Sequence, residues 1–305
     1  MFVMWWTLVF LIGGFQLSDS VSLICYKGTI DNYQEVTLDN AELLIDSSCI
    51  DVSVETFIYT FGYRAKVNDN NTKIIITACL KDSVKRNCVL LNWEEEARNL
   101  DIQTALVSYV LRAIPNSIKI GVIMGKTLIK LSNYGLNLKS VILVGHSLGA
   151  HLWGNTGRQI KSDGKCIEII VGLDPAGPFY DTEFPEPLNA ASAPCVYCVH
   201  TDPGKLGINS SECTIDVWVN FNHFINGDNL QPGCTDDVCN HSRAISLLEY
   251  SILVNKTALE ASKATDYYAW AAANGTAAET IYIGDLINTQ LVFLSIGTVI
   301  ALLIK

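Results

Sequence analysis

The stretch Ser140-Val-Ile-Leu-Val-Gly-His-Ser-Leu-Gly-Ala-His151 decides the fold of this chain. An apolar run leads into Gly145-x-Ser147-x-Gly149, and a segment with helical character follows. A strand, a tight turn and a helix in this order place the serine on a strained turn that lifts its Oγ out of the sheet. Gly145 and Gly149 fit this turn because a Cβ there would collide with neighbouring chain. The pattern predicts a nucleophilic Ser147, with the Leu148 N–H at the helix start able to donate to an oxyanion.

The alternation of apolar strands and helices continues on both sides of this stretch. Helices are predicted over residues 102–131 and 151–160, and a further one over residues 244–254. Several of the apolar runs have no polar alternation, as expected for strands that are covered on both faces. Strands that alternate with helices indicate an α/β protein with a mostly parallel central sheet flanked by helices. The predicted strands are residues 55–60, 73–77, 88–92, 140–144, 167–173 and 195–200.

Length and composition exclude several classes of protein. The chain has 305 residues, which allows one large domain or two modest ones, and 49% of them are hydrophobic, which excludes general disorder. The formal net charge is -10, with 31 acidic and 21 basic residues. Such a surface repels phosphate backbones, so no nucleic-acid partner is expected. Long apolar runs occur only at the two ends, which excludes a polytopic membrane protein.

The two ends of the chain have their own signals. Residues 1–15 are almost wholly apolar and polar chain follows, which predicts a cleaved signal peptide over residues 1–20, with a short membrane anchor or a buried helix as alternatives. A folded domain is expected over residues 21–290. Residues 291–305 contain a second apolar run, which is expected to be the last strand of the domain. The alternative for this run is a lipid-anchor signal that would tether the protein to a cell surface.

Cysteine usage favours an oxidising compartment and therefore secretion. A zinc site is the weaker alternative because Cys195-x-x-Cys198 is the only CxxC pair and no histidine lies at finger spacing. Cys234 and Cys239 are predicted to form a bridge, since a turn of four residues brings their Cα atoms within the roughly 4.4–6.8 Å that a disulfide needs. Glycosylation sequons begin at Asn70, Asn209, Asn240, Asn255 and Asn274. The ten cysteines are Cys25, Cys49, Cys79, Cys88, Cys166, Cys195, Cys198, Cys213, Cys234 and Cys239.

A serine nucleophile needs a base and an orienting carboxylate. In α/β proteins with this serine turn, the chain order is serine, then acid, then histidine. Asp174 directly follows the apolar run 167–173 and precedes Pro175, which puts it at the carboxyl edge of the sheet, where sites are built. Asp181 and Asp202 are the other candidates, but neither directly follows so strong a strand. Asp174 is therefore predicted to be the acid.

Five histidines compete for the role of base. His146 and His151 belong to the serine turn itself and point wrongly for this role. His200 and His223 lie in strand-like segments, where a structural role is more common. His241 comes last, in a loop that a disulfide through Cys239 would anchor, just before the helix predicted over residues 244–254. His241 is therefore predicted to be the base.

These segments together resemble the pancreatic lipase family of animal secreted lipases. The resemblance covers roughly residues 25–290 and keeps the family's motif order. It implies the α/β-hydrolase fold, with Ser147 as nucleophile, Asp174 as orienting acid and His241 as base. It implies no metal and no cofactor, and no colipase-type partner is expected because a further domain for it is missing. The motifs that carry it are Gly145-His-Ser-Leu-Gly-Ala-His151, Gly172-Leu-Asp-Pro-Ala-Gly-Pro178, His200-Thr-Asp202, Gln231-Pro-Gly-Cys234 and Cys239-Asn-His-Ser-Arg243.

The resemblance also implies an oxyanion hole and a disulfide. The family carries His-Gly-Phe after an early strand, and this chain has Phe61-Gly62-Tyr63 there. By analogy, the Tyr63 N–H is the second oxyanion donor beside that of Leu148, without the family's supporting histidine. The family further suggests a bridge between Cys25 and Cys88.

The segment between Cys234 and Cys239 bears on the substrate. In the family, a lid that covers the site lies between these two cysteines, and here only four residues separate them. The loop over residues 204–214 is also short. Both short segments resemble those of the phospholipase A1 branch, including the insect enzymes. They suit that activity because a polar headgroup needs an open rim around the site. The expected activity is hydrolysis of the sn-1 ester of phospholipids, and the alternatives are a triacylglycerol or galactolipid hydrolase or a non-catalytic, yolk-like lipid-binding homologue.

Overall fold

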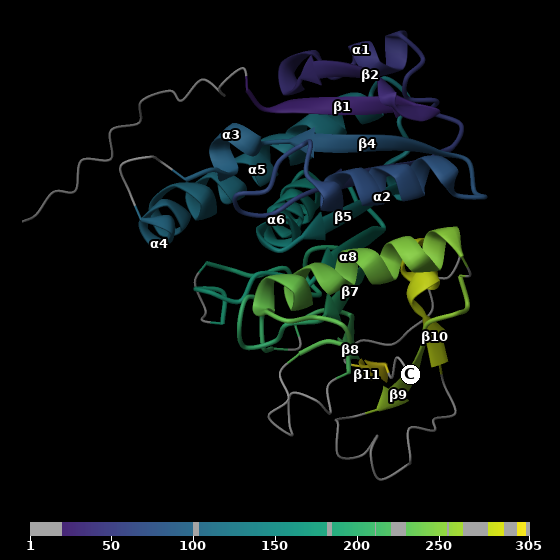
Figure 1. Cartoon of the computed structure of the whole chain (residues 1–305). Coiled ribbons are helices and arrows are strands. Elements are labelled where there is room, and N and C mark those ends of the chain that lie inside the picture. The colour runs from purple at the N-terminus through teal and green to yellow at the C-terminus, as the bar shows by residue number, and fades with distance from the viewer. Residues whose placement is uncertain are drawn as a thin grey trace, which may run out of the picture.

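The architecture is an eleven-stranded sheet with helices packed on it (Figure 1). This computed structural model describes residues 20–99, 104–181, 185–210, 212–220, 230–254, 256–264, 280–289 and 298–302. The order of strands across the sheet is β10-β9-β11-β8-β7-β6-β5-β3-β4-β1-β2. The strands are β1 Ser22–Lys27, β2 Thr29–Thr37, β3 Glu55–Thr60, β4 Arg86–Asn92, β5 Val141–His146, β6 Ile169–Leu173, β7 Cys195–His200, β8 Ile215–Val219, β9 Glu260–Ala264, β10 Thr280–Tyr282 and β11 Thr298–Leu302.

The seven neighbouring strands β11, β8, β7, β6, β5, β3 and β4 run parallel to one another. At the two edges of the sheet, β9 and β10 and also β1 and β2 pair antiparallel. β5 and β6 are buried over their whole length, as the continuous apolar runs predict for strands covered on both faces. The predicted α/β fold with a mostly parallel sheet is confirmed, and it is the α/β-hydrolase fold. β11 lies between β8 and β9, within the apolar run near the C-terminus. The expected signal peptide lies outside the described residues.

Two pairs of helices cover the central strands, with α5 packed against α6 and α2 against α8. Figure 1 shows α2 and α8 side by side in front of the sheet. The predicted helices over residues 102–131 and 151–160 are confirmed. The helical elements are η1 Leu38–Asn40, α1 Leu43–Asp46, α2 Asn70–Lys81, α3 Glu94–Ala97, α4 Ala105–Ser108, the π-helical η2 Tyr109–Ala113, α5 Ile114–Ser132, η3 Leu138–Ser140, α6 Leu148–Ser162, α8 Asp237–Leu253 and η4 Ile283–Ile287.

The helical run Ala105–Ser132 is long and apolar enough to cross a membrane by length and composition alone. In this structure its α5 part packs on α6 instead, where the Thr156 hydroxyl donates to the carbonyl of Gly121 at 2.9 Å. Its buried residues recur at helical spacing, including Ile120, Met124 and Leu128. The α5 part of this run is therefore a core helix of the α/β layer.

The strand predicted over residues 73–77 is wrong, because these residues lie inside α2. Their β-branched composition suggested a strand. The buried positions in α2 include Thr72, Ile75, Ile76 and Cys79, which is the spacing of one helix face. The helical period over the longer segment therefore outweighed the local strand preference.

Four disulfides are present in the described part of the chain, and one prediction about them is wrong. Cys25 pairs with Cys49 and Cys79 with Cys88, so the expected Cys25–Cys88 bridge does not form. In the β1–β4 register Cys25 stands opposite Val89, one residue from Cys88. Neighbouring positions along a strand face opposite sides of the sheet, which separates the two sulfurs. The predicted Cys234–Cys239 bridge is present, Cys198 pairs with Cys213, and Cys166 and Cys195 are free thiols.

Candidate active site

Ser147 occupies the turn between β5 and α6. Its backbone has φ 56° and ψ -125°, a conformation that non-glycine residues rarely adopt. The Ser147 N–H donates to the carbonyl of Leu173 at 3.0 Å, so the end of β6 holds this turn in place. Such strain persists only where the surrounding structure enforces it, and it is typical of functional sites.

Asp174 and His241 form a buried hydrogen-bonded pair. The Asp174 Oδ2 accepts from His241 Nδ1 at 2.5 Å, although 67 residues separate them in the chain. The other oxygen, Oδ1, accepts the backbone N–H groups of Thr201 at 2.6 Å and Asp202 at 3.1 Å. A carboxylate satisfied in this way fixes the hydrogen on Nδ1 and leaves Nε2 of a neutral imidazole as a proton acceptor.

Gly207 allows the Asp174 carboxylate to lie where it does. A Cβ at Gly207 would stand 2.6 Å from each carboxylate oxygen, closer than real Cβ atoms approach. Gly207 lies in the loop between β7 and β8, and its N–H donates to the carbonyl of Asp202 at 3.0 Å. No local sequence pattern marks this glycine, since its role depends on a residue from another strand.

The two alternative acids do not reach His241. Asp181 is exposed, and its Oδ1 accepts the Asn209 N–H at 2.9 Å. Asp202 is buried next to the pair, but its carboxylate accepts from the Leu206 N–H at 3.0 Å and from Asn240 Nδ2 at 3.2 Å. Burial raises the pKa of Asp202 to about 6.

His241 lies inside α8 rather than in a loop before the helix, so that part of the prediction is wrong. The helix begins at Asp237, and the side chain of Asp236 caps it by accepting the Cys239 N–H at 2.8 Å. The segment between Cys234 and Cys239 is thus the capped start of α8. The prediction took the residues after Cys239 as a disulfide-anchored loop, whereas the N-cap Asp236 is the signal that places the helix start earlier.

The other described histidines hold the structure around this pair. His146 Nε2 donates to the carbonyl of His241 at 3.0 Å, and the two rings lie 4.6 Å apart. His151 Nε2 donates to the Ala176 carbonyl at 2.8 Å, which fixes the loop after Asp174. His200 pairs with Asp216 at 2.8 Å. His223 lies outside the described residues.

The Phe61-Gly62-Tyr63 segment lies directly against Ser147. A Cβ at Gly62 would stand 2.6 Å from the Ser147 Cβ, so only glycine permits this approach. In place of a preceding histidine, the indole N–H of Trp93 donates to the buried Phe61 carbonyl at 3.0 Å. The Tyr63 hydroxyl donates to the Ala105 carbonyl at 2.6 Å. Among the loop and turn hydrogen bonds between backbone groups of the described residues, none has the Tyr63 N–H or the Leu148 N–H as its donor.

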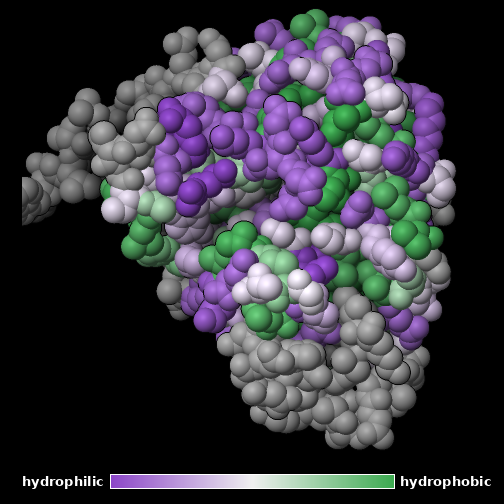
Figure 2. Space-filling model, in the orientation of Figure 1, coloured by the Kyte–Doolittle hydropathy of each residue, from purple (hydrophilic) through white to green (hydrophobic). Residues whose placement is uncertain are grey.

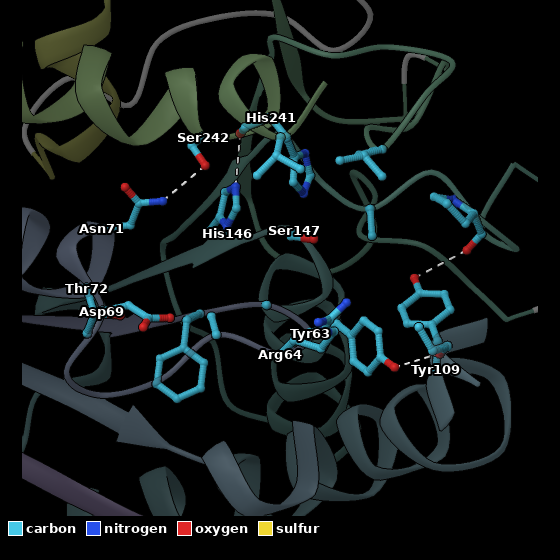
Figure 3. A pocket seen from close by; sticks show the side chains of 18 of the residues that line it. Tyr63, Arg64, Asp69, Asn71, Thr72, Tyr109, His146, Ser147, His241 and Ser242 are labelled. Atoms are coloured by element: carbon cyan, nitrogen blue, oxygen red, sulfur yellow. Dashed lines mark hydrogen bonds between the residues drawn. The ribbon is translucent and has the colours of Figure 1, made fainter. Parts of the chain in front are cut away.

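A cavity of about 700 Å³ opens over these residues. Ser147, His241 and Tyr63 line it, and Figure 3 shows Tyr63 and Tyr109 on one side of Ser147 and Asn71 and Ser242 on the other. The tyrosine side also carries Arg64, and the other side carries the Asp69 carboxylate as well as amide and hydroxyl groups. The remaining lining residues include Phe61, Arg64, Asp69, Thr72, Ala105, Leu106, Pro178, Leu206 and Val238.

One predicted glycosylation site is incompatible with the fold. Asn240 is fully buried, and its side chain donates to Asp202 and accepts the Gln231 N–H at 2.7 Å. Asn70 and Asn209 are exposed. The sequons at Asn255 and Asn274 lie outside the described residues.

Acid should destabilise the protein through its buried histidines. Burial lowers the pKa of His151 from 6.5 to about 3, so the folded protein keeps this ring neutral while the unfolded chain takes up a proton. The contribution of His151 to the free energy of unfolding is fully present above pH 6.5. Between pH 6.5 and pH 3 it falls by about 1.4 kcal/mol for each unit that the pH is lowered. We expect the His151→Gln variant to lose stability less steeply than the wild type between pH 6 and pH 4, by about that slope, in urea unfolding at each pH. Identical slopes would contradict this assignment.

Comparison with known proteins gives concordant results. The family model described as Lipase matches residues 17–284. The chain is 35% identical over 196 residues to "Phospholipase A1" of Vespula squamosa, covering 62% of each protein. It is 35% identical over 232 residues to "Phospholipase A1 member A" of Bos taurus, covering 73% of this chain and 47% of the relative. "Phospholipase A1 4" of Polistes dominula is 29% identical over 202 residues, covering 65% of this chain and 61% of the relative. The chain thus spans about half to three fifths of the length of these relatives.

Proposed function

The chain belongs to the lipase family, and from this premise we propose that it is a secreted carboxylic ester hydrolase of the phospholipase A1 type. The observation that carries the proposal is the buried Asp174–His241 pair, whose histidine lines the same cleft as the strained Ser147. A serine, a histidine and a carboxylate in this relation are the parts of acyl-transfer catalysis. The matched relatives are phospholipases A1 by name.

Each residue has a definite role in the proposed reaction. Ser147 Oγ attacks the carbonyl carbon of the sn-1 ester while His241 Nε2 accepts its proton, and Asp174 stabilises the imidazolium. The N–H groups of Tyr63 and Leu148 hold the negative carbonyl oxygen. His241 then gives its proton to the departing lysophospholipid. It next takes a proton from a water that attacks the acyl-serine, and it returns this proton to Ser147 Oγ as the fatty acid leaves.

The open cleft supports phospholipids over neutral lipids. The four residues between Cys234 and Cys239 contribute the cap and the first helical residues of α8, and they form no apolar cover. Amide and hydroxyl groups of Asn71 and Ser242 line one side of the cleft, with Asn71 Nδ2 donating to Ser242 Oγ at 3.0 Å. A wettable rim of this kind suits a polar headgroup.

The proposed substrate is presented at a lipid surface. Leu106 and Val238 line the cleft and are 60% and 67% exposed, and Leu111 on η2 is 69% exposed. Figure 2 shows apolar surface at the end of the molecule where α4 lies. Exposed apolar groups at a cleft mouth are typical of surfaces that contact membranes or partners.

The proposal includes a mature protein that starts after a signal peptide over residues 1–20. Four disulfides in the described residues favour an oxidising compartment. We place the catalytic domain over residues 21–290. Asn70 and Asn209 are the exposed candidates for glycosylation.

The Gly62→Ala variant should lose most of its activity without unfolding. The new Cβ would push the Tyr63 segment away from Ser147, which removes one oxyanion donor and costs about 100- to 1,000-fold in kcat. The measurement is kcat on a soluble nitrophenyl ester. Gly164→Ala serves as the control for backbone strain alone, because Gly164 has φ 73° and follows the end of α6, away from the cleft, with open space where its Cβ would stand. Full activity in Gly62→Ala would exclude the Tyr63 N–H from the oxyanion hole.

Positional selectivity tests the substrate assignment. We would offer phosphatidylcholine with different acyl chains at sn-1 and sn-2 and identify the first fatty acid released. The proposal requires release from sn-1 before acyl migration. Preferential release from sn-2 would contradict the A1 assignment while leaving the ester-hydrolase chemistry intact.

A further inference from the structure

Arg64 brings a cationic side chain to the cleft, next to a proposed oxyanion donor. It follows Tyr63 directly and lines the same cleft as Ser147 and His241. Among the described lining residues it is the only lysine or arginine, and Asp69 is the only carboxylate. Figure 3 shows the Arg64 side chain close to Tyr63, on the tyrosine side of Ser147.

The backbone of Arg64 is held in an unusual conformation. Its φ of 64° lies in the left-handed region, which favours glycine over arginine. The Arg64 N–H donates to the Ala97 carbonyl at 2.8 Å, which fixes the residue after the oxyanion donor. Strain of this kind at a non-glycine residue is typical of functional segments.

The Arg64 guanidinium has no ion-pair partner within the described part of the chain, so its charge is available to a ligand. Asp69, the one carboxylate of the described lining, does not pair with Arg64. Its side chain instead accepts the Lys66 N–H at 2.8 Å at the start of α2. A cation that is exposed and unpaired, on a backbone held at the edge of a cleft, suits an anionic substrate group.

The geometry of a phospholipid fits this position. Its phosphodiester is attached to the same glycerol as the sn-1 ester, a few bonds from the carbonyl. When the carbonyl oxygen lies at the Tyr63 N–H, the phosphate comes within reach of the neighbouring arginine side chain. Guanidinium groups bind phosphate oxygens through paired N–H donors, and a neutral glyceride offers no such acceptor.

We propose that Arg64 binds the phosphate of the substrate and thereby sets the preference for phospholipids over neutral esters. This inference rests on the proposed phospholipase function. It adds the residue that recognises the headgroup, which the Ser147, Asp174 and His241 chemistry does not require.

The test compares Arg64→Gln with the wild type on two monomeric substrates, dihexanoylphosphatidylcholine and p-nitrophenyl butyrate. We expect kcat/KM for the phospholipid to fall by about 10- to 100-fold, since a charge-assisted hydrogen bond is lost. The neutral ester should be hydrolysed at nearly the wild-type rate. Lys66→Gln is the matched control, because Lys66 is exposed on the same loop and does not line the cleft, and it should leave both rates unchanged.

A binding measurement separates recognition from a structural role. A non-hydrolysable dihexyl-ether phosphatidylcholine should inhibit p-nitrophenyl butyrate hydrolysis by the wild type and by Arg64→Lys more strongly than by Arg64→Gln. Equal losses on both substrates would overturn the inference, since they would indicate a displaced Tyr63, and unchanged rates on both would also overturn it. A wild type that cleaves only the neutral ester would instead overturn the phospholipase function together with the inference.

Discussion

Replacing Ser147 with alanine is expected to abolish ester hydrolysis. The hydroxyl is the only group that the proposed mechanism uses as nucleophile, and its backbone strain serves no purpose without it. Loss of the serine in comparable triads costs about 10⁴- to 10⁶-fold in kcat. The measurement is fatty-acid release from phosphatidylcholine micelles by purified protein at saturating substrate.

Ser242→Ala is the matched control for Ser147→Ala. Ser242 lines the same cleft and accepts a hydrogen bond from Asn71 at 3.0 Å, but it has no part in the reaction. Ser242→Ala should therefore retain activity within about an order of magnitude. Residual hydrolysis by Ser147→Ala at a rate similar to that of Ser242→Ala would exclude Ser147 as the nucleophile.

Replacing Asp174 with asparagine is expected to lower kcat by about 10⁴-fold while leaving the fold intact. The amide keeps the shape of the side chain but not its charge, so it neither holds the hydrogen on His241 Nδ1 nor stabilises the imidazolium. The Asp174 oxygens also accept two backbone N–H groups, so a thermal melt should accompany the kinetic assay. KM should change much less than kcat.

Asp202→Asn is the control for Asp174→Asn, since both carboxylates are buried at the same edge of the sheet. The Asp202 carboxylate bonds to Leu206 and Asn240 and not to His241, so its loss should affect catalysis far less. A larger defect in Asp202→Asn than in Asp174→Asn would transfer the acid role to Asp202.

The positions of the proposed nucleophile and acid could be predicted because local patterns mark them. An apolar strand followed by Gly-x-Ser-x-Gly and a helix constrains the backbone at Ser147 within a dozen residues. Asp174 follows from the same logic, since the carboxyl end of a buried parallel strand is always at one edge of the sheet. At this edge Asp174 meets His241, which helix α8 supplies.

The supporting contacts could not be predicted because they join distant segments. Gly207 is needed only because the Asp174 carboxylate lies against it, and Trp93 supports Phe61 across 32 residues. The same limit explains the wrong disulfide. Cys25 lies opposite Val89 rather than Cys88, and this register between β1 and β4 cannot be derived from either segment alone. The helical state of α2 became evident only from its longer period, whose buried face includes Ile75, Ile76 and Cys79.

Fatty-acid release from phosphatidylcholine micelles and from emulsified triolein, measured in parallel with the purified wild-type protein, tests the central claim most directly. We expect faster release from phosphatidylcholine, because the cleft is open, has polar groups on one side and carries Arg64. Release from triolein alone would contradict the phospholipid assignment and keep the ester-hydrolase chemistry. No release from either substrate by folded protein would contradict the catalytic account and indicate a lipid-binding role.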